Sequence, residues 1–393
     1  MSLFSSRFSG DLTPNRLTRA LDAKHAAGRP ILDLTESNPT RAGFDYSRTS
    51  LLSALASLAA LRYDPSPRGL LSARQAVAGY YRRHGETVHP DSLTLTASTS
   101  EAYGYLFKLL ADPGDEILIP RPGYPLLDML LTLESLRPVF YPLQYDDHAG
   151  WQVDVERLRH SVGERSRAIV AVSPNNPTGS YLKPAELAAL TELCAERALA
   201  LLVDEVFLDY PAPGGSATAH SAIANSGALT FVVSGLSKIA ALPQVKLSWI
   251  HVGGPASLRA ETQSRLDFIA DTYLSVSTPV QHAAPALLAE SVSVRAQIAA
   301  RLERNEQTLR VRCAAGAGRV LRREGGWYAV LEIPPALSDD DLSFQLLEHD
   351  NVLAHPGYFY DFTRENVLVL SLLTPPDVFD AGLAKVLARI GMI

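Results

Sequence analysis

Three short polar segments each follow an apolar run, and their residue types could do chemistry together. The first, SPNNPTG, contains Asn175 and Asn176. The second begins with Asp204, directly after the run LALLV, and the third, SGLSK, ends on Lys238. Strands buried on both faces consist of near-continuous apolar runs, and ligands of parallel sheets bind where such strands end. The three segments therefore predict a site at one edge of a sheet.

Lys238 is the candidate nucleophile of this site. A lysine that lies in a crevice is partly desolvated, which lowers its pKa and favours the neutral, nucleophilic amine. Taken alone, Lys238 also fits a simpler interpretation, because most lysines are solvated surface charges. Its chemical interpretation depends on the other two segments.

Asp204 and the asparagine pair each have a functional and a structural interpretation. A carboxylate that follows a buried strand is costly unless a partner compensates it, so Asp204 could face a cationic ring nitrogen. Alternatively, Asp204 caps the next turn. Asn175 and Asn176 could point into the site, or SPNNPTG could be an ordinary turn, because its prolines and glycine favour one.

Around these segments, apolar strands alternate with amphipathic helices. Strands are predicted at residues 115–120, 168–173, 199–203, 229–234 and 248–253, and a helix at 184–198. This alternation predicts an α/β fold, with a three-layer α/β/α large domain of residues 46–275 around a mainly parallel sheet. Residues 271–311 are largely helical in pattern. A smaller α+β domain of residues 1–45 and 276–393 is predicted from strands at 327–333, 351–354 and 367–371 and helices at 338–350 and 377–390.

Composition and charge exclude several classes of function. The chain has 393 residues and a formal net charge of −6, which gives no electrostatic basis for binding nucleic acid or a membrane surface. Cys194 and Cys313 lack the spacing of a disulfide framework or a zinc cluster, and we expect no metal site. The N-terminal residues lack the apolar core of a secretory signal, and no apolar run approaches ~20 residues. We therefore expect a cytoplasmic protein without a membrane span.

The order of the three segments resembles that of class I and II aminotransferases, which are fold-type I enzymes dependent on pyridoxal phosphate (PLP). Further stretches strengthen the resemblance. YDPSPRGLLSARQAV contains Tyr63 and Gly69, PRPGYP contains Tyr124, and TASTSEAY contains a candidate phosphate loop. GGWYAVL and HPG resemble landmarks of the family's small domain. The resemblance begins near Leu32 and covers most of the chain.

The resemblance implies a role for each matching residue around the ring of PLP. Lys238 would hold the cofactor covalently and later move the proton of the reaction. Asp204 would pair with the protonated pyridine nitrogen. Asn176 would hydrogen-bond the phenolic oxygen, and Tyr124 would stack on the ring.

Other matching residues would bind the cofactor's phosphate. Ser98, Thr99 and Ser100 would donate hydrogen bonds at a helix N-terminus, together with Ser237. The alternative for this loop is an ordinary N-cap cluster. Tyr63 matches a tyrosine that reaches the phosphate of the neighbouring subunit, which implies a homodimer with shared active sites.

Two positions near the cofactor depart from the family pattern. Phe207 occupies the position of a tyrosine that usually bonds the phenolic oxygen, so Asn176 would hold that oxygen alone or Tyr210 would substitute. Lys246 replaces an arginine that clamps the phosphate. A lysine keeps the charge but lacks the planar bidentate fork.

The third departure concerns the substrate. Val369, in ENVLVLSLLT, fills the position of the arginine that grips the substrate's α-carboxylate. Arg41, Arg364 and Arg121 are candidate substitutes, although each also fits an ordinary surface residue. Asn38, in DLTESNPT, is a further candidate for substrate contact. A substrate without an α-carboxylate is the remaining alternative.

The function predicted from the resemblance is transfer of an amino group from an α-amino acid to a 2-oxo acid by a ping-pong mechanism. A PLP-dependent β-lyase of the cysteine-conjugate type is the alternative, since the same lysine and aspartate serve both reactions. A non-catalytic PLP-binding homologue ranks last, because Lys238 and Asp204 are both present. The reaction product separates the first two: a transaminase leaves pyridoxamine phosphate, whereas a lyase releases ammonia and pyruvate.

Overall fold

The larger of two main sheets forms the centre of the molecule. The computed structural model describes residues 3–8, 13–46, 48–213, 220–314, 318–335 and 338–392. Eight strands lie in the order β2-β9-β8-β7-β6-β3-β4-β5. Neighbours from β8 to β4 run parallel, whereas β9 and β5 are antiparallel to their neighbours. The strands are β2 (Leu93–Thr96), β3 (Glu116–Arg121), β4 (Arg137–Asp146), β5 (Gly150–Val153), β6 (Ser166–Val172), β7 (Ala200–Asp204), β8 (Thr230–Gly235) and β9 (Ser248–Gly253).

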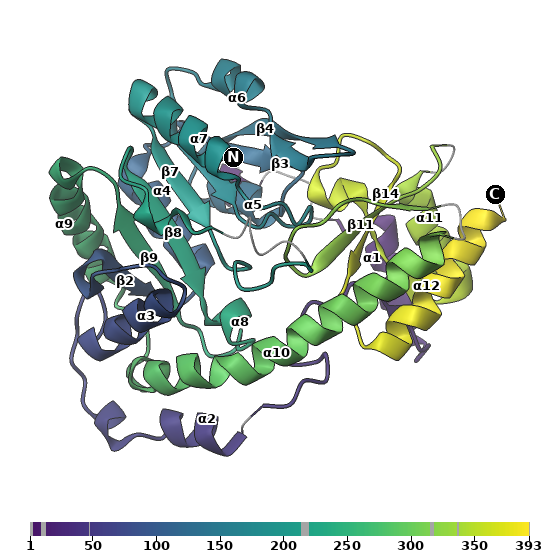
Figure 1. Ribbon diagram of the computed structural model, residues 1–393, viewed down its shortest axis with the longest axis horizontal. Coiled ribbons are helices and arrows are strands. Elements are labelled where there is room, and N and C mark those ends of the chain that lie inside the picture. Colours follow the sequence, from purple (N-terminus) through teal and green to yellow (C-terminus); the bar gives the residue numbers. More distant parts are fainter. Residues whose placement is uncertain are drawn as a thin grey trace.

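Helices cover both faces of this sheet (Figure 1). Because successive strand residues point to opposite faces, Leu202 packs in one apolar core and the adjacent Leu201 and Val203 pack in the other. On the first face lie α4 (Thr99–Leu110), α5 (Leu126–Leu133) and α9 (Ala256–Tyr273). On the second lie α3 (Leu71–Arg83), α6 (Val155–Ser161) and α7 (Pro184–Arg197). The predicted three-layer α/β/α arrangement is confirmed.

The second sheet is smaller and antiparallel, with the strand order β10-β11-β14-β13. These strands are β10 (Arg319–Val320), β11 (Tyr328–Glu332), β13 (His355–Pro356) and β14 (Val367–Ser371). A separate parallel pair joins β1 (Leu32–Asp33) to β12 (Val352–Leu353). Helices α1 (Arg16–Ala26), α11 (Asp339–Gln345) and α12 (Pro376–Gly391) lie around these strands (Figure 1). The predicted α+β character of this region is confirmed.

One long helix spans both parts of the molecule. α10 (Thr278–Ala314) has 37 residues, and its N-terminal part packs against α3 and α2 (Arg48–Leu55). Its C-terminal part contributes Val294, Ile298 and Leu302 to the core beneath the smaller sheet. Figure 1 shows α10 running beneath the larger sheet toward α12. No helix in the described ranges is both long enough and apolar enough to cross a lipid bilayer.

A buried ion pair connects α10 to the segment that leads into β11. Arg323 Nη2 lies 2.5 Å from Glu306 Oε2, and the Arg323 side chain is only 3% exposed. Arg323 Nη1 also donates to the carbonyl of Gly326 at 2.6 Å. Arg310, by contrast, reaches the other Glu306 oxygen from the surface, with its side chain 49% exposed. These contacts keep the Glu306 pKa below its ordinary value despite burial.

Replacing Arg323 with methionine should destabilise the fold by about 3 kcal/mol, because it leaves a buried carboxylate with half of its partners. The matched change Arg310→Met should cost less than about 1 kcal/mol, since that pair is exposed to solvent. Chemical denaturation of both variants measures the difference. Equal losses would show that burial does not set the strength of this pair.

Candidate active site

Lys238 lies at the C-terminal edge of the larger sheet. β8 ends at Gly235, and Lys238 belongs to the short helix α8 (Leu236–Ile239) that follows. Lys238 Nζ lies 5.0 Å from the ring centre of Trp327 and 5.6 Å from that of Phe207. Burial lowers the pKa of Lys238 to about 8, although the charge of Asp204 opposes this shift. The neutral amine is therefore a minor form near neutral pH, but a far larger fraction than in an ordinary solvated lysine.

Asp204 ends β7, the strand beside β8, where it pairs with Val233. Its carboxylate is buried and has two neutral hydrogen-bond donors: the Tyr103 hydroxyl at 3.0 Å and the Val206 backbone N–H at 3.0 Å. Burial raises the pKa of Asp204 to about 6, while both hydrogen bonds and Lys238 oppose the rise. Asp204 is thus a buried carboxylate that a neighbouring cation would stabilise.

The adjacent Glu205 has a structural part. Its two carboxylate oxygens accept hydrogen bonds from Ser221 Oγ at 2.7 Å and from the Ala222 N–H at 2.6 Å. Burial raises the pKa of Glu205 to about 8. Glu205 therefore anchors the loop that follows β7. Asp204 is the member of this acidic pair that is available to a ligand.

The two asparagines of SPNNPTG also differ: one is used to hold the turn, and the other is available to a ligand. Asn175 Nδ2 donates to the Pro122 carbonyl at 3.2 Å and to Thr178 Oγ1 at 2.9 Å, so it holds the turn. Asn176 is buried, and its Oδ1 has no hydrogen-bond partner among the described residues. Asn175 Oδ1 also lacks a described partner, but the Nδ2 of Asn175 is used within the turn. Asn176 is therefore the asparagine of this pair whose amide group is available to a ligand.

Gly179, at the end of the same turn, packs against the segment that precedes Trp327. Its φ is +71°, and a Cβ at this position would lie 2.5 Å from the Gly325 carbonyl and 2.5 Å from Arg323 Cγ. The Gly179 carbonyl accepts hydrogen bonds from the Glu324 N–H at 3.1 Å and the Gly325 N–H at 2.8 Å. Only glycine permits this close approach of two backbones.

The serine-rich loop forms the start of α4. Ser98 is its N-cap, and Ser98 Oγ accepts a hydrogen bond from the Glu101 N–H at 3.1 Å. The N-cap interpretation therefore describes the Ser98 hydroxyl in this structure. Thr99 and Ser100 occupy the first helical positions, where backbone N–H groups lack partners within the helix.

Several predicted cofactor contacts lie at the surface of the single chain. Tyr124 lies between β3 and α5 with 46% exposure, and Tyr63 is 70% exposed. Lys246 is exposed, with a backbone φ of +62°, whereas Ser237, beside Lys238, is half-buried. The structure thus brings Lys238, Asp204 and Asn176 to one sheet edge and leaves Tyr63 and Lys246 open to solvent.

The predicted substrate residues have structural roles of their own. Asn38 Oδ1 accepts hydrogen bonds from the Thr40 N–H at 3.0 Å and its hydroxyl at 2.7 Å. Arg364 Nη1 lies 2.5 Å from Glu332 Oε1, and the Arg41 side chain is exposed.

Arg121 is held more loosely. It stacks 4.4 Å above the Phe140 ring, and its nearest carboxylate contact, to Asp361, is 3.4 Å. Its buried Nε has no hydrogen-bond partner among the described residues. Arg121 is thus held by one ring contact and one long ion pair.

Tyr103, Trp327 and Tyr210 are site residues to which the sequence analysis gave no firm role. Tyr103 orients the Asp204 carboxylate, and Trp327 flanks Lys238 Nζ. The Tyr210 hydroxyl donates to the Lys238 backbone carbonyl at 2.5 Å, which fixes α8. The only sequence signal was the position of Tyr103 and Trp327 inside stretches already noted as family landmarks.

Comparison with known proteins identifies the class. The sequence profile described as aminotransferase class I and II matches residues 31–377, so the chain belongs to this family of PLP-dependent enzymes. A glutamate-pyruvate aminotransferase of Haemophilus influenzae is 30% identical over 65% of this chain and 63% of its own length, so the match spans less than two thirds of that relative. An alanine aminotransferase of Mycobacterium bovis is 27% identical over 93% of this chain and 86% of its own length.

Solved structures show the same fold. An alanine aminotransferase of Pyrococcus furiosus superposes with a TM-score of 0.86 at 23% identity, covering 99% of this chain and 100% of that one. A Thermus thermophilus aspartate aminotransferase variant gives a TM-score of 0.82 at 24% identity, with 99% and 100% coverage. The predicted family and fold are confirmed.

The lowered pKa of Lys238 can be tested on the protein without cofactor. Capture of PLP by Lys238, trapped by borohydride reduction, should rise with pH around a midpoint of about 8 rather than 10.5. Asp204→Asn should move this midpoint lower, because the carboxylate charge stabilises the ammonium form. A midpoint near that of free lysine would show that Lys238 is fully solvated.

Proposed function

We propose that this chain is a PLP-dependent aminotransferase that moves an amino group from an α-amino acid to a 2-oxo acid by a ping-pong mechanism. The observation that carries the proposal is the placement of Lys238 and Asp204 on adjacent strand ends. Their pKa values, about 8 and about 6, both result mainly from burial. In this proposal residues 46–275 form the cofactor-binding domain, and residues 1–45 and 276–393 form the second domain.

The residues at this edge fit PLP. The cofactor needs an amine for its aldehyde, an anion for its ring nitrogen and a donor for its phenolic oxygen. Lys238 and Asp204 supply the first two groups, and the Nδ2 amide group of Asn176 would supply the donor. When bound, PLP supplies an electron-accepting ring that stabilises negative charge at the substrate Cα.

Lys238 acts as the proton carrier in this proposal. Its Nζ takes the proton from the Cα of the amino acid and, in the second half-reaction, returns a proton to the Cα of the new amino acid. With a pKa of about 8, the Lys238 amine is basic enough to take the proton. The same pKa leaves a usable fraction of the amine in its neutral form. The Trp327 and Phe207 rings beside Nζ exclude water, and Tyr210 holds the Lys238 backbone in place.

Asp204 would supply the negative charge that pairs with the protonated ring nitrogen of the cofactor. Tyr103 and the Val206 N–H fix both of its oxygens, so the carboxylate is oriented before any ligand arrives. Since its pKa of about 6 was set by burial without a ligand, a bound cation would lower it again. Asp204 therefore stays ionised near neutral pH.

The phosphate would lie at the N-terminus of α4, where Thr99 and Ser100 supply backbone N–H groups and the helix dipole favours an anion. Ser98 is the N-cap of this helix, and in this proposal Ser237 and Lys246 would add contacts to the phosphate. The Lys246 ammonium supplies charge without the bidentate geometry of a guanidinium.

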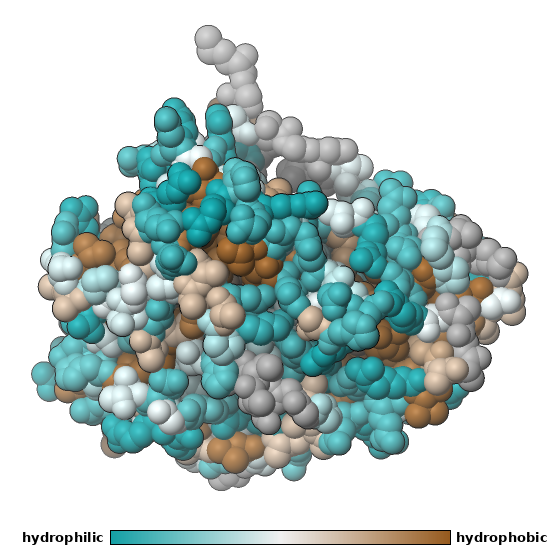
Figure 2. All heavy atoms as spheres, turned by 45° about the horizontal axis from the view of Figure 1, so that its top comes forward, coloured by the Kyte–Doolittle hydropathy of each residue, from teal (hydrophilic) through white to brown (hydrophobic). Residues whose placement is uncertain are grey.

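A homodimer completes the site in this proposal, with Tyr63 reaching the phosphate of the other subunit. The segment that carries it is exposed and apolar, with Leu52, Leu58 and Leu61 outside the core. On the face drawn in Figure 2, apolar residues occur in small groups within a mostly hydrophilic surface. A local run of exposed leucines beside Tyr63 is thus a reasonable place for a second copy.

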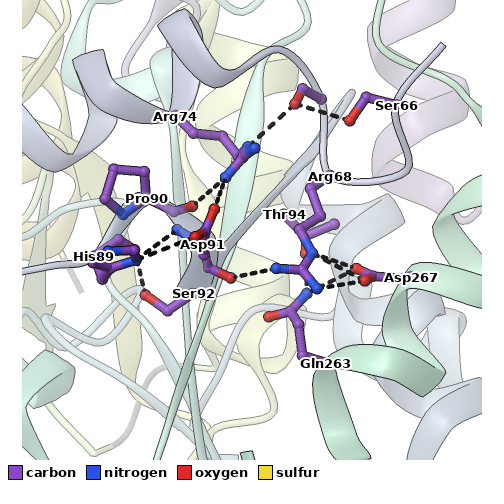
Figure 3. Close-up of polar contacts among 11 residues, drawn as sticks. Ser66, Arg68, Arg74, His89, Pro90, Asp91, Ser92, Thr94, Gln263 and Asp267 are labelled. Atoms are coloured by element: carbon purple, nitrogen blue, oxygen red, sulfur yellow. Dashed lines mark hydrogen bonds and ion pairs between the residues drawn. The ribbon is translucent and has the colours of Figure 1, made fainter. Parts of the chain in front are cut away.

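Arg68, five residues after Tyr63 in the chain, is held by the polar contacts that Figure 3 shows. Arg68 Nε and Nη2 lie 2.8 and 2.6 Å from the Asp267 carboxylate, and Arg68 Nη1 donates to the Asp91 carbonyl at 2.9 Å. Gln263 binds the same Asp267 carboxylate at 3.0 Å. This network fixes the loop's base, which supports a role in presenting Tyr63 to a partner.

The proposal is tested by absorption spectra of the PLP-loaded protein with single amino acids and no 2-oxo acid. A transaminase should convert the cofactor to pyridoxamine phosphate with one or more of them. Persistent cofactor absorption with release of ammonia would assign lyase chemistry instead. Absence of any spectral change across the panel would overturn both.

Asp204→Asn should lower kcat by at least ~100-fold, because the charge that stabilises the protonated ring is lost. Tyr103→Phe is the milder companion, and it should cost about tenfold or less, since it removes one neutral hydrogen bond. Steady-state kinetics with the identified amino acid measures both. If Tyr103→Phe lowered kcat as much as Asp204→Asn does, the charge of Asp204 would not be what the reaction requires, and the role of Asp204 would be structural.

A further inference from the structure

An unbroken row of aromatic rings leads from Lys238 to the smaller sheet. Phe207, which flanks Lys238 Nζ, lies 6.4 Å from Tyr328 between ring centres. Tyr328 lies 6.2 Å from Tyr360, and Tyr360 lies 5.8 Å from the His355 ring. Tyr360 lies next to the segment that carries Tyr124, because its carbonyl accepts the Gly123 N–H at 3.0 Å. We call Phe207, Tyr328, Tyr360 and His355 the aromatic wall.

Strand register places the wall around Val369. In the antiparallel sheet Val369 pairs with His355 on one side and with Val330 on the other, while Tyr328 pairs with Ser371. Directly paired residues, and those two positions along, share one face of a sheet. His355 and Tyr328 therefore flank the position where the resemblance predicted an arginine, and Val369 itself is fully buried.

Hydrogen bonds join the polar ends of these rings. The Tyr360 hydroxyl lies 3.2 Å from His355 Nδ1, and the His355 ring stacks on Phe359 with centres 5.0 Å apart. The Tyr328 hydroxyl contacts Ser37, in the N-terminal loop. That loop is tied to the same sheet, because Ser371 Oγ donates to the Glu36 carbonyl at 2.6 Å.

The wall is electrically neutral near neutral pH. Burial raises the pKa of Tyr328 to about 12 and that of Tyr360 further, so both hydroxyls keep their protons. Burial lowers the pKa of His355 to about 4, so its ring is uncharged.

The nearby carboxylates are engaged within their own loop. Glu36 Oε1 accepts the Asn38 N–H at 2.8 Å, and Asp33 Oδ1 accepts the Thr35 N–H at 2.7 Å. Both are carboxylates that add negative charge beside the wall, Asp33 acting on His355 and Glu36 on Tyr328. The hydroxyl groups of Tyr328 and Tyr360 are the donors that the wall can offer.

We propose that Tyr328, Tyr360 and His355 form the subsite for the substrate's α-carboxylate, which they bind through neutral hydrogen bonds instead of an ion pair. The inference rests on the proposed aminotransferase function and names how that site selects its substrate. Lys238 must reach the substrate Cα, so the carboxylate on that carbon lies within one bond of the reacting atom. His355 and Tyr328 are polar groups of the smaller sheet that flank Val369.

Neutral donors make this subsite different in kind from an arginine clamp. A hydrogen bond from a neutral donor to a charged carboxylate is stronger than one between two neutral groups. Low local dielectric strengthens each of them. Because no full charge attracts the carboxylate over a distance, the apparent affinity should depend little on ionic strength.

The experiment compares an amino acid that the wild-type protein accepts with the primary amine that lacks only its carboxylate. Both can react with the PLP-loaded protein, and spectral titration gives an apparent Kd for each. Tyr328→Phe and Tyr360→Phe should each raise the Kd of the amino acid roughly five- to tenfold, and leave that of the amine unchanged. Tyr145→Phe is the matched control, since its hydroxyl accepts the Arg322 N–H outside the wall, at 2.9 Å.

The outcomes separate the two proposals. If both substitutions change neither Kd, or change both Kd values equally, the subsite assignment is overturned while the aminotransferase function stands. If the wild-type protein converts no amino acid to the oxo acid, the proposed aminotransferase function is overturned, and the subsite proposal that rests on it is overturned as well. A selective loss for the amino acid, absent in Tyr145→Phe, supports the neutral subsite.

Discussion

Burial of a cation and an anion at one sheet edge is the constraint on which the rest of the site depends. Desolvation moves the pKa of Lys238 down to about 8 and that of Asp204 up to about 6. Their mutual attraction opposes both shifts but does not cancel them. The fold maintains this unfavourable burial because β7 and β8 are adjacent, parallel and covered on both faces by helices. Its chemical benefit is an amine that is a base near neutral pH.

The parts of the site that lie at strand ends were predictable from sequence. A polar residue that directly follows a buried apolar strand lies at the end of that strand, at the edge of the sheet. Lys238 and Asp204 are such residues, and Asn176 is another within a turn. The strands and the helix predicted in the centre of the chain are also confirmed, because near-continuous apolar runs mark strands that are buried on both faces. The hairpin β4–β5 was missed, since β4 mixes exposed and half-buried residues and contains Pro138 and Pro142.

The aromatic wall could not be predicted, because its members come from three separate segments. Tyr328 begins β11, whereas His355 and Tyr360 lie on either side of a turn before β14. Their proximity depends on the register of short antiparallel strands, and a shift of one residue would turn them to the opposite face. The sequence showed a missing arginine at Val369, but only the register shows which side chains surround that position.

The contact between Gly179 and Gly325 has a mechanical consequence. It joins the turn that carries Asn176 to the segment that carries Trp327 and Tyr328, with backbone packed on backbone. Because no flexible side chain separates these two backbones, a displacement of the segment that carries Trp327 passes directly to the turn that carries Asn176.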